Sequence, residues 1–129
     1  RNNMKVRIYY EDTDAAGIVY HANFIKYCER ARSEIFFQQG FNSHDKMNNE
    51  HFVVRNIICD FVQTSFLGDL LEVKTQILTR KNSSVILKHN ILRDEELICS
   101  FEVVLVYVKD YKAIKIPDKV FEILENKKQ

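Results

Sequence analysis

Three acidic side chains lie close together near the N-terminus, immediately before a glycine and an amphipathic stretch. Glu11, Asp12 and Asp14 precede Gly17, and beyond this point the apolar residues take up helical spacing. A carboxylate beside the unpaired N–H groups of a helix N-terminus can attack an acyl carbonyl or activate water, while those N–H groups polarise the carbonyl. The pattern is therefore compatible with a hydrolase site.

The same acids also have a purely structural interpretation. Asp12 or Asp14 could cap the helix, because aspartate is a favoured N-cap residue, and Glu11 could simply face water. Residue types and spacing alone leave both interpretations open.

The hydrophobic pattern predicts the elements that would position these acids. Apolar residues alternate over residues 5–11, which indicates a first strand, and residues 12–17 form a polar loop. Residues 18–39 carry apolar side chains at helical spacing and predict one long amphipathic helix. Gly40 is expected to end this helix, since glycine adopts the left-handed conformation without steric cost.

Four further strands and a short helix are expected after the long helix. The strands span residues 52–66, 70–81, 84–93 and 97–108, and their turns contain Gly68-Asp69, Asn82-Ser83 and Asp94-Glu95. Such short connections predict an antiparallel meander. Residues 101–108 are apolar on both alternate faces, which favours a central strand covered on both sides. Pro117 should begin the final helix.

Composition indicates one domain over residues 1–129, and the order of strand, long helix and further strands indicates the α+β class. The chain is 46% hydrophobic and 29% charged, as expected of a single soluble domain. Its net charge of +1 provides no field that would draw it to nucleic acid or to an anionic membrane. No apolar run approaches the ~20 residues of a membrane span, and no signal-peptide pattern begins the chain.

The cysteines indicate a cytoplasmic protein. Cys28, Cys59 and Cys99 are odd in number, far apart and embedded in apolar stretches, the pattern of buried free thiols in a reducing compartment. Cys28 should lie on the apolar helix face without a histidine partner, so it is a poor candidate nucleophile.

The acidic stretch also carries a dense motif. It reads Asp12-Thr13-Asp14, Ala15-Ala16-Gly17, Ile18-Val19, Tyr20 and His21-Ala22-Asn23-Phe24. These residues resemble the active-site signature of the 4-hydroxybenzoyl-CoA thioesterase family, and most of all its bacterial Tol-Pal-associated acyl-CoA thioesterase branch. The helix continuation over residues 26–36 is similar as well. Ala16 stands where relatives often carry glycine.

The resemblance implies a hotdog fold, in which a long central helix packs on an antiparallel β-sheet. It implies an acyl-CoA thioesterase that releases free acid and coenzyme A, with Asp14 as nucleophile or general base. Backbone N–H groups from Gly17 to His21 would polarise the carbonyl, and Asp12 would support the loop. Coenzyme A would be part of the substrate, and no further cofactor is expected.

Other residues are candidates for contact with the substrate. Tyr20 and Asn23 belong to the motif and are expected to line the site. His21 could orient water or the leaving thiolate, or it could hydrogen-bond the backbone. Arg80 and Lys81 form a basic turn that could meet the phosphates of coenzyme A, and a solvated hairpin turn is the alternative.

The remaining titratable residues are given structural or surface roles. The histidines at 44, 51 and 89 show no zinc-like spacing with one another or with cysteine, so no metal site is expected. Glu29 and Glu34 are helix carboxylates of the kind that other hotdog thioesterases use. With Asp14 present, a solvated or salt-bridged helix face is the better interpretation.

The partners follow from the fold and the resemblance. One helix cannot cover both faces of a sheet, so a homo-oligomer, either a dimer or a tetramer, is expected. The thiol carrier could be coenzyme A or acyl carrier protein, and the sequence does not fix the acyl group. A non-catalytic acyl-carrier or envelope-complex binding protein on the same scaffold is the alternative function. A hotdog dehydratase is disfavoured, because those enzymes carry a loop histidine among prolines and glycines, whereas the only proline of this chain is Pro117.

Overall fold

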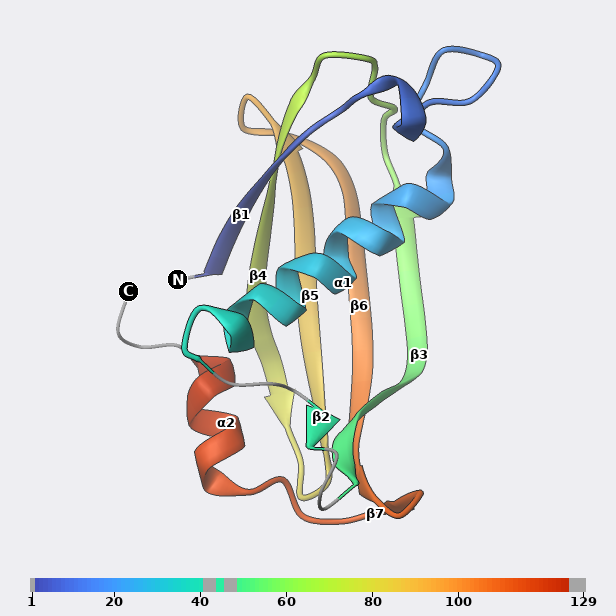
Figure 1. Ribbon diagram of the computed structural model, residues 1–129. Coiled ribbons are helices and arrows are strands. Elements are labelled where there is room, and N and C mark those ends of the chain that lie inside the picture. The colour runs from blue at the N-terminus through green and yellow to red at the C-terminus, as the bar shows by residue number, and fades with distance from the viewer. Residues whose placement is uncertain (1, 41–43, 46–48, 126–129) are drawn as a thin grey trace.

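The computed structural model describes residues 2–40, 44–45 and 49–125 (Figure 1). In these residues one antiparallel sheet of seven strands is accompanied by two helices, α1 (His21–Phe37) and α2 (Asp118–Glu125). The α+β class expected from the sequence is therefore confirmed. None of the helices so described is long and apolar enough to cross a membrane.

The seven strands pair in an order that differs from their order in the chain. They are β1 (Asn2–Arg7), β2 (His44–Asp45), β3 (Glu50–Phe61), β4 (Leu70–Arg80), β5 (Ser84–Arg93), β6 (Glu96–Lys109) and β7 (Lys112–Ala113). The order across the sheet is β1-β4-β5-β6-β3-β2, and β7 pairs with β6. The strand over residues 84–93 has the bounds that the sequence predicts.

The predicted meander is confirmed only for β4, β5 and β6. β3 does not lie beside β4 but pairs with β6 on the far side of the sheet (Figure 1). The connection 62–69 crosses the end of the sheet, where the Gly68 N–H donates to the Ile8 carbonyl at 2.9 Å. Arg93 holds the same segment through the Thr64 carbonyl at 3.2 Å. Gly68 therefore makes a turn against β1 and not a hairpin.

The other two predicted turns are hairpins. The β4–β5 turn closes where the Lys81 N–H donates to the Ser84 carbonyl at 2.8 Å. Asp94 and Glu95 have φ angles of 49° and 67°, the left-handed values of a two-residue hairpin whose twist matches the strands.

The first strand begins and ends earlier in the chain than the predicted residues 5–11. β1 ends at Arg7, and Tyr10–Asp12 form a short 3₁₀ helix, η1. The reason is local, because the Tyr9 N–H donates to the Asp12 carboxylate at 2.9 Å and thereby closes a turn. Tyr10, which the alternation placed in the strand, is 80% exposed.

The long helix also begins later than predicted. α1 starts at His21 and not at Ile18, because Ile18 forms an isolated β-bridge with Phe66 on the crossing segment. An apolar residue that pairs in a bridge looks the same in sequence as one on a helix face. The helix also ends at Phe37, earlier than the predicted Gln39, and Gly40 closes the turn that follows it with a φ of +69°.

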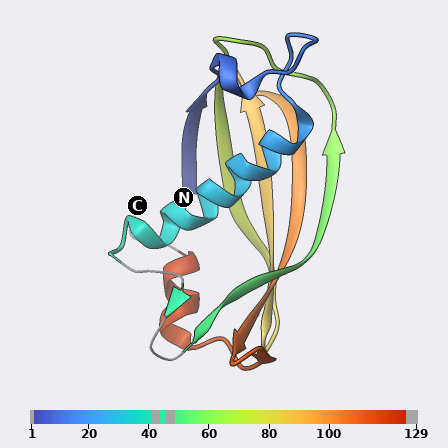
Figure 2. The same ribbon diagram turned by 45° about the vertical axis from the view of Figure 1, so that its right-hand side comes forward.

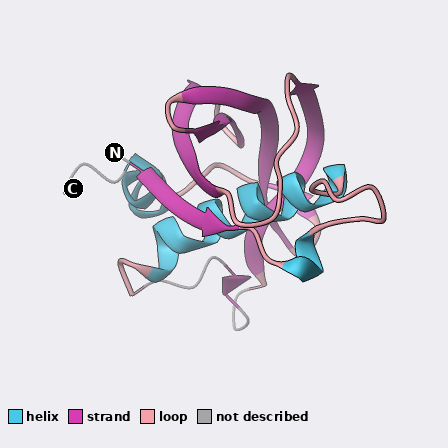
Figure 3. Ribbon diagram, turned by 90° about the horizontal axis from the view of Figure 1, so that it is seen from above, coloured by secondary structure: helices cyan, strands magenta, loops and turns pink. Residues whose placement is uncertain are grey.

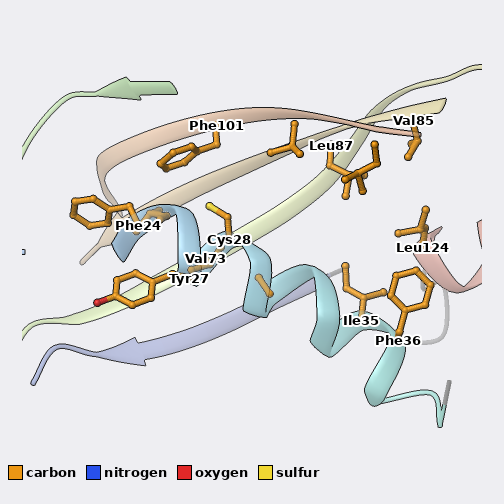
Figure 4. Close-up of a cluster of buried hydrophobic side chains, with 14 of the residues drawn as sticks. Phe24, Tyr27, Cys28, Ile35, Phe36, Val73, Val85, Leu87, Phe101 and Leu124 are labelled. Atoms are coloured by element: carbon orange, nitrogen blue, oxygen red, sulfur yellow. The ribbon is translucent and has the colours of Figure 1, made fainter. Parts of the chain in front are cut away.

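The core lies between α1 and one face of the sheet. Seen from above, α1 runs across the concave side of the curved sheet (Figure 3). Its buried residues are Phe24, Tyr27, Cys28, Ala31, Ile35 and Phe36. They belong to one buried cluster with side chains from β4, β5 and β6, among them Val73, Leu87 and Phe101 (Figure 4). α2 closes the core near the C-terminal end of α1 (Figure 2).

β6 is central, as predicted, but only one of its faces is fully covered within the chain. Phe101 and Val103 on the inner face are each 1% exposed, whereas Val104 and Val106 between and beyond them are half-buried. The cover expected on the second face is therefore not supplied by the described residues. An apolar pattern predicts that a face of the strand is buried, but it does not identify the element that buries it.

The prediction of three buried thiols is wrong for one of them. Cys28 and Cys99 are buried and free, whereas Cys59 is free but exposed on β3. Among the described residues, β3 has β6 as a neighbour on one side and only the two residues of β2 on the other. An apolar stretch in such a strand keeps part of its surface in solvent.

Candidate active site

Asp12 ties the loop to the start of α1. Its carboxylate accepts the Tyr9 N–H, and its carbonyl accepts the Tyr20 N–H at 3.2 Å and the Asn23 side-chain amide at 2.8 Å. A support role for Asp12, as the resemblance implies, agrees with these contacts. Asn23 thus positions the loop in this structure, and its contact with substrate stays a prediction.

Asp14 lies in a tight turn directly before the helix. Its Oδ1 accepts the Ala16 N–H at 2.9 Å, and its carbonyl accepts the Gly17 N–H at 2.9 Å. Gly17 has a φ of +82°, a left-handed value that favours glycine, so it allows the chain to turn. Asp14 is exposed, and among the described residues its Oδ2 has no hydrogen-bond partner. This oxygen is available for chemistry.

Neither acid caps the helix. The N-cap of α1 is Tyr20, and in the described part of the chain no side-chain hydrogen bond caps the helix there. The purely structural interpretation of Asp14 as a helix cap is therefore wrong. Its carboxylate is instead held beside the helix start by the turn that it forms with Ala16.

The backbone N–H groups from Gly17 to His21 divide into two sets. Those that donate to carbonyl groups inside the chain belong to Gly17, Val19 and Tyr20. The N–H groups of Ile18 and His21 have no acceptor in the described part of the chain. The Ile18 and His21 N–H groups are therefore open to an acceptor from outside the chain, while Gly17 shapes the turn.

Tyr20 and His21 lie exposed at the rim of the loop. Their rings are 4.6 Å apart between centroids, and the His21 ring meets the edge of Phe61 at 6.1 Å. Phe61 also contacts Phe24 and the buried Phe101. Sequence reasoning missed these aromatic contacts, because Phe61 is the last residue of β3 and lies beside the loop only through the pairing of β3 with β6.

The structure does not bring Arg80 and Lys81 to the loop of the same chain. They lie at the β4–β5 turn, at the opposite end of the sheet from residues 12–17 (Figure 1). Arg80 pairs with Asp118 at 3.4 Å, and its guanidinium lies 3.8 Å from the ring centroid of Phe121 on α2. Lys81 is exposed.

Buried groups on α1 have no nucleophilic role. Burial raises the pKa of the Cys28 thiol to about 12, so the thiolate is scarce at neutral pH. Burial and the neighbouring Asp12 carboxylate raise the pKa of Tyr27. Glu29 is exposed and accepts the Ser33 hydroxyl at 2.6 Å, in line with a solvated helix face.

His89, expected to be structural or superficial, is structural. It is 0% exposed on β5, where Nδ1 lies 2.8 Å from the Thr75 hydroxyl and Nε2 lies 3.3 Å from Nη1 of Arg32. Burial, together with the Arg32 charge, lowers its pKa to about 3. Within the described residues no group of three or more His, Cys, Asp or Glu side chains could hold a metal ion.

The chain is similar in sequence to known thioesterases. Residues 8–124 match the model of the thioesterase-like superfamily. An acyl-CoA thioesterase named YbgC from Helicobacter pylori is 50% identical over 84 residues, which cover 65% of this chain and 62% of the relative. The match thus spans less than two thirds of that relative. An acyl-CoA thioester hydrolase, also named YbgC, from Escherichia coli is 36% identical over 106 residues, or 81% of this chain and 79% of the relative.

A solved structure extends the likeness to the fold. A hypothetical protein from Aquifex aeolicus superposes with a TM-score of 0.87 at 26% identity, covering 95% of this chain and 98% of that protein. The superfamily match includes the Asp14 loop, α1 and all of α2 up to Leu124. The resemblance seen in the sequence is confirmed, and the chain belongs to the thioesterase-like superfamily.

Proposed function

We propose that this chain hydrolyses acyl-CoA thioesters to a free acid and coenzyme A, with Asp14 as the reacting carboxylate. The observation that carries the proposal is the Asp14 turn, which fixes Oδ1 on the Ala16 N–H and leaves Oδ2 open beside the start of α1. The names of the relatives from Helicobacter pylori and Escherichia coli support the reaction class.

Two reaction sequences use this geometry. In the first, Oδ2 of Asp14 attacks the thioester carbon, the C–S bond breaks, and the coenzyme A thiolate leaves a mixed anhydride that water then hydrolyses. In the second, Asp14 accepts a proton from water as the water oxygen attacks the same carbon, and the thiolate leaves with a proton from solvent. Both require an ionised carboxylate at this position.

The negative charge that develops on the carbonyl oxygen needs fixed donors. The Ile18 and His21 N–H groups are the available ones, since the other backbone N–H groups of the stretch donate inside the chain. An aligned oxyanion donor contributes ~3–4 kcal/mol, more than the ~0.3–1 kcal/mol of helix-terminus charge when exposed. The His21 ring, exposed at the rim, is placed to orient water or the leaving thiolate.

A second copy of the chain is proposed to pair with the open edge of β3. From Phe52 to Phe61 the outer edge of β3 has no strand partner among the described residues. This edge carries exposed apolar side chains, with Val54 at 48% and Ile58 at 60%. A long apolar edge strand is a template for pairing with another chain. Arg80 and Lys81 could reach a substrate held at Asp14 only if they came from such a second copy.

The test is thiol release over a panel of thioesters. Acetyl, hexanoyl, palmitoyl and benzoyl groups would each be supplied on coenzyme A, on acyl carrier protein and on pantetheine. Release from at least one coenzyme A thioester is expected. Tight binding without release from any member would contradict the proposal and favour the non-catalytic acyl-carrier function. A cytoplasmic location and association with the Tol-Pal system stay predictions from the sequence.

A further inference from the structure

The crossing segment, residues 62–69, holds the backbone of the Asp14 loop. The Val19 N–H donates to the Ser65 carbonyl at 2.8 Å, and Ile18 forms a β-bridge with the next residue of the segment. Val19 is 3% exposed and Ser65 is 0% exposed, so this contact is closed to water. The loop is therefore fixed by a distant part of the chain and not only by its own turn.

This contact sets the direction of the Ile18 N–H. In extended backbone, successive N–H groups point to opposite sides, and the N–H and carbonyl of one residue share a side. The Val19 N–H points toward the crossing segment, and the Ile18 carbonyl accepts the Asp14 N–H at 2.9 Å. The open N–H of Ile18 therefore lies on the same side of the backbone as Asp14. A thioester carbonyl that reacts at Asp14 would have to lie on that side.

The crossing segment is itself held by Arg93, the last residue of β5. Nη1 of Arg93 donates to the Thr64 carbonyl at 3.2 Å and to Oδ2 of Asp69 at 2.9 Å. The same Asp69 oxygen accepts the Phe66 N–H at 2.9 Å. The side chains of Arg93 and Asp69 are 21% and 22% exposed, so solvent screens the pair less than it screens a surface pair. One guanidinium thus holds two separate points of the segment that bonds the Asp14 loop.

We propose that Arg93 is a positioning residue for thioester hydrolysis, which fixes the Ile18 N–H beside Asp14 through the crossing segment. This inference rests on the proposed function and adds a residue that does not touch the substrate. A misplacement of ~1 Å caused by a distant mutation can cost ~10²-fold in rate. The carbonyl oxygen gains its full negative charge only in the transition state, so a misaligned donor should lower kcat and affect KM little.

The first experiment is steady-state thiol release by Arg93→Gln, at a temperature at which its thermal melt shows a folded protein. Glutamine is shorter and uncharged, so it cannot keep both contacts, and kcat should fall by ~10- to 10²-fold while KM changes by less than about twofold. Arg93→Lys keeps a charge for Asp69, so its kcat should lie between those of Arg93→Gln and the unmodified chain.

Glu96→Gln is the matched control for these variants. It removes the other carboxylate partner of Arg93, which lies at 3.4 Å and is 56% exposed, without touching the crossing segment. Exposed ion pairs contribute little, so its kcat should stay within about twofold of that of the unmodified chain.

Hydrogen exchange of single amides gives a measurement that does not depend on turnover. In Arg93→Gln the Val19 N–H should exchange at least about tenfold faster relative to the N–H of Leu87, which is buried in the middle of β5. A general loss of stability would instead accelerate both amides alike.

The outcomes separate Arg93 from the reaction itself. Normal kcat in Arg93→Gln, an equal loss in Glu96→Gln, or unchanged exchange at Val19 would each overturn the role of Arg93 and leave hydrolysis at Asp14 intact. Absence of thiol release from the unmodified chain would refute the proposed function, and the exchange of Val19 would then decide alone whether Arg93 holds the loop.

Discussion

At the scale of single residues, Asp14 and Asp12 are chemically alike but differ in what holds them. The Asp12 carboxylate accepts the Tyr9 N–H and its carbonyl anchors Asn23, whereas Asp14 keeps one carboxylate oxygen open to solvent. A carboxylate that already accepts a backbone hydrogen bond, as Asp12 does, is suited to hold the loop in place. The open oxygen of Asp14 is suited to reaction.

Asp14→Asn should therefore reduce kcat by ~10²-fold or more, because general-base catalysis contributes ~10²- to 10⁴-fold. Asparagine keeps an oxygen for the Ala16 N–H, so the thermal melt should hardly change. Asp12→Asn should be milder in kcat. Steady-state thiol release for both variants, measured beside their melts, decides the matter. Normal turnover by Asp14→Asn would overturn the assignment of this residue.

His89 makes a prediction about pH and stability. Its pKa is about 3 in the folded chain and ~6.5 when unfolded, so the unfolded state binds more protons between these values. Stability is thus fully present above pH ~6.5 and declines as the pH falls toward 3. Between pH 7 and pH 5 the loss should be about 2 kcal/mol.

The test compares urea unfolding of the unmodified chain and His89→Gln at several pH values from 7 to 5. Glutamine can still bond Thr75 and Arg32, the polar groups that contact His89 from β4 and α1, but it does not titrate. Between pH 7 and pH 5, the free energy of unfolding of this variant should fall by about 2 kcal/mol less than that of the unmodified chain. Parallel pH profiles for the two proteins would show that His89 does not set the dependence.

At the scale of elements, local sequence patterns predict individual helices and strands well, but they predict poorly which strands pair with one another. The buried face of α1 and the bounds of β5 follow from periodicity, because each depends on residues near in sequence. The pairing of β3 with β6 joins segments some 40 to 60 residues apart, and no local pattern encodes it. The shortened start of α1 has the same origin, since Ile18 pairs with the distant Phe66.

The candidate site shows the same division. The Asp14 turn is predictable because the acid, the glycine and the helix start are adjacent in sequence. The separation of Arg80 from this turn and the position of Phe61 beside His21 depend on where the strands lie. They could be found only from the folded chain.

Because the edge of β3 is open, we predict that one charged side chain placed on this edge disrupts self-association. Ile58 is 60% exposed, so Ile58→Lys should cost little within one chain, yet a lysine on an edge strand opposes pairing with another strand. At micromolar concentration the unmodified chain should sediment as a dimer or tetramer and the variant as a smaller species. Tyr111→Lys, at an 85% exposed turn position, is the control. A monomeric, fully active unmodified protein would contradict this.

At the scale of the whole molecule, the Asp14 loop and the basic turn proposed to bind the substrate lie at opposite ends of the sheet within one chain. Asp14 precedes α1, and Arg80 and Lys81 close the β4–β5 hairpin beside α2. A substrate that contacts both must therefore bridge two copies. This requirement can be tested by mixing chains that carry complementary defects.

Arg80→Ala with Lys81→Ala should raise KM for coenzyme A thioesters and leave pantetheine thioesters unaffected, since phosphate contacts are the same before and during reaction. Asp118→Asn controls for the lost ion pair of Arg80. Refolding this double variant together with Asp14→Asn should restore about a quarter of the normal activity at low substrate, because about half of the dimers would be mixed and each would hold one intact site. No recovery on mixing, with both parents folded, would place the whole site within one chain and assign the basic turn to packing against α2.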